Sequence, residues 1–314
     1  MNSEKQNKIG LIGAPLGFGA GRVGSELGVN AMRVSWIRGR RLCEHIQELG
    51  YSVTDHGDAD IVKPLVPAQP IDNPKYLPEV VTSTQNIFDA VSTLLANNEQ
   101  PVILGGDHTI AIGTFSAVSA AGRSSGSEVG LIWFDAHADI NTTETSTTGN
   151  IHGMPLAVLL GHGPNELTDI GGFTPKLDHK YLAHVGARDL DFGERSRVLD
   201  LSLRENFFTM SDIDRRGMYA CMKDALSIVS KAPGGFAVTF DIDAIDPTFA
   251  PGSGTLVRGG LTYRESHLAL EMIAAHGGMR SFEIVEVNPM LDNSNITVEL
   301  ACELILSALG KTII

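Results

Sequence analysis

Short apolar runs alternate with stretches of helical periodicity along this chain, and that alternation limits the folds it can adopt. Most of the runs are continuously apolar, which is typical of strands buried on both faces of a sheet. Strand, helix and strand in repetition over 314 residues favour one parallel sheet of about eight strands covered by helices. The predicted strands are 9–13, 51–55, 102–104, 129–134, 181–185, 206–210, 236–240 and 281–287, and the clearest predicted helices are 34–48, 80–96, 218–231, 264–275 and 297–309.

The composition allows a large buried core, with 43% hydrophobic and 19% charged residues. We expect one domain over residues 1–314. The formal net charge is −13 and no basic block stands out, so the electrostatic footprint of a nucleic-acid-binding protein is absent. This negative charge has two possible roles: it keeps the protein soluble, or it provides a weak field that attracts cationic substrates. The charge alone does not decide between the two roles.

The three cysteines, Cys43, Cys221 and Cys302, are far apart and form no Cys-x-x-Cys pair. Neither a disulfide framework nor a zinc–thiolate site is therefore expected. The N-terminal residues lack the apolar region of a signal peptide. No apolar run approaches the ~20 residues of a membrane span. We expect a cytoplasmic protein with no membrane partner.

Polar side chains gather at the ends of four predicted strands. His108 follows the third strand, 135–139 follows the fourth, 241–243 follows the seventh, and Glu286 lies near the end of the eighth. In open parallel sheets, ligands bind beyond the carboxyl ends of the strands. These four segments are thus expected along one edge of the sheet.

The spacing within two of these segments points to a metal site. Asp135, His137 and Asp139 alternate with alanines, and alternate side chains of an extended chain point the same way. Asp241 and Asp243 repeat the pattern. A single aspartate after a strand is usually a helix cap or a turn residue. Its recurrence at several strand ends favours a shared cavity lined by carboxylates and imidazoles.

With His108, the set holds four carboxylates and two imidazoles but no thiolate, which suits manganese or a similar divalent ion. Four clustered aspartates carry about −4, and such like charges raise one another's pKa. Two divalent ions bring the set near neutrality, whereas one leaves roughly −2. Two ions about 3.5–4 Å apart can share a bridging water and lower its pKa toward about 7. The charge balance therefore predicts a binuclear centre that supplies hydroxide at neutral pH.

The chain resembles the arginases of the ureohydrolase family in five segments, which follow the family's order. These segments are GGDHT (105–109), DAHADINTTETSTTGNIHGMP (135–155), GARDLD (186–191), DIDAIDPTFAPGSGTLVRGGLTYRE (241–265) and VEVNP (285–289). The resemblance implies a three-layer α/β/α fold around an eight-stranded, mostly parallel sheet. It also implies two Mn²⁺ ions per chain and a homo-oligomer, a trimer or a hexamer. The implied metal ligands are His108, Asp135, His137, Asp139, Asp241 and Asp243, with Asp135 and Asp241 contacting both ions.

Glu286 stands in an apolar strand, where an unpaired charge is costly to bury. An internal arginine or the guanidinium of a substrate would serve as its partner, and the resemblance favours the substrate. His152 matches the arginase histidine assigned to proton shuttling, although such a residue taken singly is usually a loop histidine. A side chain that titrates near pH 7 suits proton transfer between solvent and a leaving amine.

The loop 141–150 is rich in Thr, Asn and Ser, as an ordinary solvated loop would be. In arginases the corresponding loop holds the α-carboxylate of the substrate, and the resemblance places Asn141 and Thr148 in those positions. It places Asp191 at the α-ammonium group. Thr148 stands where the most familiar arginases carry Ser, so the hydroxyl is kept while an extra methyl narrows the cleft.

The expected reaction is hydrolysis of L-arginine to L-ornithine and urea by a metal-bridging hydroxide. Glu286 and the backbone of Thr255 would hold the guanidinium, and Asp139 would pass a proton to the leaving nitrogen. One alternative is another ureohydrolase, acting on agmatine, a guanidino acid or formimidoylglutamate. Agmatine has no α-carboxylate for Asn141 and Thr148 to hold. A second alternative is a metal-binding relative without turnover, against which the complete ligand set and His152 argue.

Overall fold

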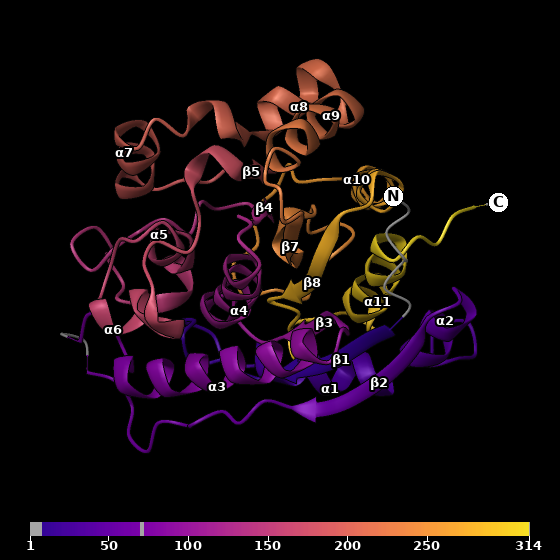
Figure 1. Ribbon diagram of the computed structural model, residues 1–314, viewed down its shortest axis with the longest axis horizontal. Coiled ribbons are helices and arrows are strands. Elements are labelled where there is room, and N and C mark those ends of the chain that lie inside the picture. Colours follow the sequence, from indigo (N-terminus) through magenta and orange to yellow (C-terminus); the bar gives the residue numbers. More distant parts are fainter. Residues whose placement is uncertain (1–7, 70–71, 314) are drawn as a thin grey trace.

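All eight predicted strands are present in the computed structural model, which describes residues 8–69 and 72–313. They form one sheet in the order β2-β1-β3-β8-β7-β4-β5-β6, and every neighbouring pair is parallel. Helices cover both faces of this sheet (Figure 1), which confirms the predicted three-layer α/β fold. The strands are β1 (Lys8–Ala14), β2 (Ser52–Asp58), β3 (Gln100–Gly105), β4 (Gly130–Phe134), β5 (Leu182–Val185), β6 (Phe207–Phe208), β7 (Phe236–Asp241) and β8 (Met279–Val285).

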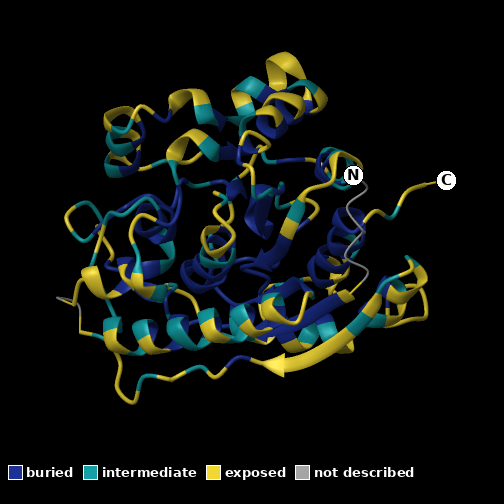
Figure 2. Ribbon diagram, in the orientation of Figure 1, coloured by how far each residue is buried: buried dark blue, intermediate teal, exposed yellow. Residues whose placement is uncertain are grey.

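The continuous apolar runs are explained by two hydrophobic cores, one on each face of the sheet. Along β4, Ile132 and Phe134 belong to one core, whereas Leu131 and Trp133 belong to the other. Successive side chains of a strand point to opposite faces, so a strand covered on both sides is apolar throughout. Figure 2 shows the result as buried central strands beneath helices whose outer surfaces are exposed. The edge strand β2 is mostly exposed and correspondingly polar.

Two groups of helices supply the rest of these cores. Helices α3, α4 and α5 pack on one face, while α1, α2, α9, α10 and α11 pack on the other. Within residues 8–69 and 72–313, no helix has the length and apolar character needed to cross a membrane. The helices are α1 (Gly28–Val34), α2 (Leu42–Glu48), α3 (Leu77–Ala96), α4 (Ala111–Ser124), α5 (Pro155–Leu159), α6 (Asn165–Thr168), α7 (Phe192–Asp200), α8 (Met210–Arg216), α9 (Met218–Val229), α10 (Tyr263–His276) and α11 (Ile296–Ala308).

The predicted helix 34–48 is wrong, because the chain forms two helices with a turn between them. The backbone groups of Ile37 and Arg40 bond to each other across that turn, at 2.8 and 3.1 Å. Arg38 (φ 48°) and Gly39 (φ 83°) both adopt left-handed conformations, which a right-handed helix excludes. The other four predicted helices match α3, α9, α10 and α11 to within a few residues.

The sheet order places the polar segments side by side. The strands β3, β8, β7 and β4 are consecutive neighbours at the centre of the sheet, so their carboxyl ends share one edge, as predicted. Strand β8 ends at Val285 rather than at residue 287. Glu286 follows it with a φ of 61°, and its N–H donates to the carbonyl of Gly106 at 2.7 Å. That turn directs the chain over the end of β3.

Candidate metal centre and substrate pocket

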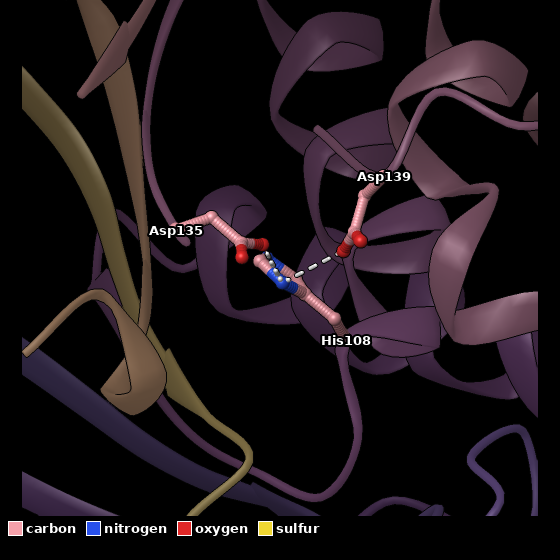
Figure 3. A group of neighbouring side chains, drawn as sticks. All are labelled: His108, Asp135 and Asp139. Atoms are coloured by element: carbon pink, nitrogen blue, oxygen red, sulfur yellow. Dashed lines mark ion pairs between the residues drawn. The ribbon is translucent and has the colours of Figure 1, made fainter. Parts of the chain in front are cut away.

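His108 lies at the centre of a buried group of carboxylates beyond the ends of β3, β4 and β7. Its Nδ1 is 3.1 Å from Oδ2 of Asp135, 3.1 Å from Oδ2 of Asp139 and 3.3 Å from Oδ2 of Asp241. Figure 3 shows His108, Asp135 and Asp139 pointing toward one another. All four residues are buried. This group thus brings together one imidazole nitrogen and three carboxylate oxygens.

A second group forms around His137, which is only partly buried. Its Nδ1 is 3.2 Å from Oδ2 of Asp243 and 3.4 Å from Oδ1 of Asp135. Asp135 therefore belongs to both groups, with Oδ2 facing His108 and Oδ1 facing His137. In the sets His108–Asp135–Asp139 and Asp135–His137–Asp243, the potential ligand atoms lie within 4.8 Å of one another. Two sets that share a carboxylate are the arrangement expected for a pair of ions with a bridging ligand.

The side chains two positions apart in each segment are brought together by turns and not by an extended chain. Oδ1 of Asp135 accepts the N–H of His137 at 2.8 Å, and Oδ1 of Asp241 accepts the N–H of Asp243 at 2.8 Å. Asp139 has a φ of 50°, so the expected extended geometry of 135–139 is not present. The aspartates act both as turn residues and as members of the cluster, because one carboxylate can accept several hydrogen bonds.

The electrostatics of the cluster call for added positive charge. Burial and the charge of Asp135 raise the pKa of Asp139 to about 8. Burial and the charges of Asp243 and Asp135 raise the pKa of Asp241 well above its usual range. Although burial also acts to raise the pKa of Asp135, the neighbouring imidazoles of His108 and His137 hold it well below its usual range. These aspartates cannot all ionise together at neutral pH without cations beside them.

The nitrogen of His108 also fits a metal. Its Nδ1 is buried and, within the described residues, forms no hydrogen bond in acceptable geometry despite the nearby carboxylates. The ring is held in place by stacking on Trp133, with the ring centroids 4.1 Å apart and the planes at 16°. Trp133 in turn donates from Nε1 to Oδ2 of Asp135 at 3.0 Å. An unpartnered, rigidly held nitrogen among hard oxygens suits a divalent ion such as Mn²⁺.

A cavity of about 260 Å³ adjoins this cluster. It brings the predicted substrate residues of three separate segments to one place, although Glu286 lies buried beside it rather than in its wall. Its size suits a small molecule rather than a polymer. The lining residues are His137, Asp139, Asn141, Thr148, His152, Gly153, Asp189, Asp191, Glu194, Asp241 and Thr255.

The outer part of the cavity holds a neutral donor beside an acid. Nδ2 of Asn141 donates to Oδ2 of Asp191 at 2.8 Å, and Oδ1 of Asp191 caps α7 by accepting the N–H of Glu194 at 2.8 Å. Thr148 is exposed, and its hydroxyl oxygen accepts the N–H of Asn150 at 3.2 Å. Amide, hydroxyl and carboxylate groups are thus available together at the mouth.

Glu286 and His152 form a pair beneath the cavity. Oε1 of Glu286 accepts the backbone N–H of His108 at 3.1 Å and lies 3.0 Å from Nδ1 of His152. Among the interactions of the described residues, its ion-pair partner is this histidine and not an internal arginine. Burial alone would lower the pKa of His152, but the bond to Glu286 and the charges of Asp107 and Asp139 raise it to about 9.

Comparisons with known proteins point to one family. The family model described as "Arginase family" matches residues 7–310. A curated arginase from Brevibacillus brevis is 40% identical over 306 residues, covering 98% of this chain and 99% of that protein. The chain belongs to the arginase family. The native arginase structure from Bacillus caldovelox matches with a TM-score of 0.90 at 39% identity, covering 98% of this chain and 100% of that one. The structure of Entamoeba histolytica arginase in complex with L-ornithine matches with a TM-score of 0.85 at 29% identity. The match covers 97% of this chain and 99% of that one.

Glu194 and Trp133 are among the residues of this arginase-family site that the sequence-based set lacks. Glu194 lines the cavity, and its Oε1 accepts the backbone N–H groups of Ala138 and Asp139 at 3.2 and 2.9 Å. Burial raises its pKa to about 7. The run DFGE at 191–194 carries a capping-box spacing that could have identified it. Trp133, in contrast, reads as an ordinary core residue of β4.

The loop that carries Asp243 is fastened from two sides. The hydroxyl of Thr255 donates to Oδ2 of Asp243 at 2.8 Å. The guanidinium of Arg188 donates to the carbonyls of Asp243 and Val257 at 2.7 Å each and to that of Ala244 at 3.1 Å. Arg188 is partly buried, and it therefore links the end of β5 to the two segments that follow β7.

Replacing Arg188 with methionine is expected to destabilise the protein. Each hydrogen bond to a charged group contributes about 1.5–3 kcal/mol, so losing the two shortest lowers the free energy of unfolding by about 3–6 kcal/mol. Urea denaturation in the presence of a chelator measures this without a contribution from metal. The exposed Arg215→Met variant is the matched control. Equal urea midpoints for Arg188→Met and Arg215→Met would show that the hydrogen bonds of Arg188 do not stabilise the fold.

Proposed function

We propose that this protein hydrolyses L-arginine to L-ornithine and urea at a centre of two Mn²⁺ ions. The observation that carries the proposal is the pair of ligand sets sharing Asp135 beside a small cavity. Membership of the arginase family and 40% identity to a curated arginase support the substrate. The residues proposed to hold the ions are His108, Asp135, His137, Asp139, Asp241 and Asp243.

Bound ions would supply a water molecule with a pKa lowered toward about 7 and would stabilise negative charge in the transition state. The chain's own groups then position the substrate and move protons. Asp139, which lines the cavity, would accept a proton from the attacking water and pass it to the leaving nitrogen. The main chain of Thr255 would contact the guanidinium, since its side chain is fixed to Asp243.

Glu286 would bind the guanidinium through parallel N–H···O bonds. Its carboxylate is already fixed by the backbone N–H of His108. A cationic guanidinium also offsets the charge that raises the pKa of His152 to about 9. Substrate binding therefore lowers the pKa of His152 toward neutrality, where an imidazole exchanges protons efficiently with a leaving amine.

Recognition of the α-amino acid end would fall to the mouth of the cavity. Asn141 and Thr148 would donate to the α-carboxylate, and Asp191 would accept from the α-ammonium. The contact between Asn141 and Asp191 supports this, because it holds a neutral donor and an acid side by side in the lining of the cavity.

The variant Thr148→Val is expected to lower kcat/KM for arginine roughly 10- to 150-fold, because a hydrogen bond to a charged group contributes about 1.5–3 kcal/mol. Activity on agmatine should change little, since agmatine has no α-carboxylate. Steady-state kinetics on both substrates give the informative ratio, and the exposed neighbour Thr147→Val serves as control. An equal loss on both substrates would mean that the hydroxyl only supports the loop through Asn150.

Substrate identity is tested by urea release from arginine, agmatine and guanidinobutyrate, each with and without added manganese. We expect arginine to be the preferred substrate and manganese to be required. A preference for agmatine or guanidinobutyrate would replace arginine with another ureohydrolase substrate. No urea from any of them would favour a metal-binding relative without turnover or a non-guanidino substrate such as formimidoylglutamate.

A further inference from the structure

A carboxylate that takes no part in the proposed reaction lies inside the sheet. Glu283, in the middle of β8, is only 4% exposed. In the sheet register it stands directly opposite Thr239 of β7 and Ile103 of β3. The hydroxyl of Thr114, from α4, donates to its Oε2 at 2.5 Å. Burying a carboxylate is costly, so an acid in this central strand calls for an explanation.

The hydrogen bonds around Glu283 lead to the metal cluster. Burial raises the pKa of Glu283, and hydrogen bonds from the hydroxyls of Thr114 and Thr239 oppose that shift. The oxygen of Thr239 also lies 2.9 Å from Nε2 of His108. Thr239 therefore lies between Glu283, directly opposite it in the register, and His108, in a line that runs from the interior of the sheet to its carboxyl edge.

The chemistry of these groups fixes the direction of the line. In its ionised form Glu283 only accepts hydrogen bonds, so Thr239, opposite it in the register, would direct its one hydroxyl proton to Glu283. Its oxygen must then accept a proton from Nε2–H of His108. This tautomer leaves the lone pair of His108 on Nδ1, the atom that faces Asp135, Asp139 and Asp241.

We propose that Glu283 is a positioning residue for the metal centre, acting through Thr239 to fix the tautomer and orientation of His108. The proposal rests on the proposed function, because it takes His108 as a metal ligand. Carboxylates that act on a ligand histidine from outside the coordination sphere typically strengthen metal binding by about 10- to 100-fold. Here the hydroxyl of Thr239 would link the carboxylate of Glu283 on β8 to the imidazole of His108.

The variant Glu283→Gln keeps the shape of the side chain but loses its charge, and its amide brings a donor of its own. Calorimetric titration of the metal-stripped full-length protein with MnCl₂ should show binding about 10- to 100-fold weaker than wild type. Thr239→Val should show a similar loss, because it cuts the line at its middle. Thr239→Ser keeps the hydroxyl and should bind as tightly as wild type. If Thr239→Val binds manganese as tightly as wild type, the line is excluded even where Glu283→Gln fails to fold.

A double-mutant cycle separates this role from a merely structural one. In the Thr239→Val background, adding Glu283→Gln should weaken manganese binding no further, since the line is already cut. Fully additive losses would overturn the proposal. So would a lower melting temperature of metal-free Glu283→Gln combined with wild-type manganese affinity. If the wild-type protein binds no manganese, both the metal centre and the role of Glu283 are wrong. If the variants bind manganese as tightly as wild type, only the role of Glu283 is wrong.

Discussion

Replacing Asp135 with asparagine is expected to abolish urea release and to free at least one metal ion. Asp135 is the residue common to both ligand sets, with one oxygen facing His108 and the other facing His137. The amide removes a unit of negative charge and leaves one oxygen where there were two. The opposing imidazoles then lose the carboxylate that separates them, so neither set is complete.

Metal analysis after gel filtration, together with the urea assay, measures both effects of Asp135→Asn. The variant Asp214→Asn is the control, because Asp214 is exposed on α8 and belongs neither to the two ligand sets nor to the lining of the cavity. It should keep two ions and full activity. Asp135→Asn protein that retains two ions and the wild-type rate would remove the basis for a shared carboxylate.

Replacing His152 with alanine is expected to lower kcat by about 10²- to 10⁴-fold, the typical contribution of a positioned proton-transfer group. Both ions should remain bound, because His152 contacts Glu286 rather than the two ligand sets. Added imidazole should restore part of the rate by entering the space left by the side chain.

Steady-state kinetics and metal analysis on the same preparation test this expectation. The exposed His179→Ala variant controls for the loss of a histidine elsewhere. If His152→Ala lost an ion, His152 would be a ligand and not a proton carrier. An unchanged kcat would exclude it from proton transfer altogether.

The fold could be predicted from the sequence because its central strands are buried on both faces. Continuous apolar runs such as 129–134 have no other plausible place in a parallel α/β protein. The position of the site followed from the same reasoning, since Asp135 and Asp241 come directly after such runs and His108 follows one four residues later. Boundaries were less predictable: β6 spans only Phe207–Phe208, where the pattern predicted 206–210.

What the sequence could not reveal depends on contacts between distant segments. Glu286 and His152 are 134 positions apart, and nothing local in either segment indicates that they pair. Glu283 and Thr239 look like exceptions within apolar strands until the register places them opposite each other. Trp133 likewise reads as core, although it holds both His108 and Asp135. Sequence patterns identify which strand end carries a polar group, but three-dimensional packing decides which neighbour that group serves.

The central claim, arginine hydrolysis at a two-metal centre, is tested most directly by titrating metal-stripped protein with manganese while urea release from L-arginine is followed. Urea production should rise with added manganese and reach its maximum at two bound ions per chain. Full activity with a single bound ion, or no urea from arginine with both sites filled, would contradict it.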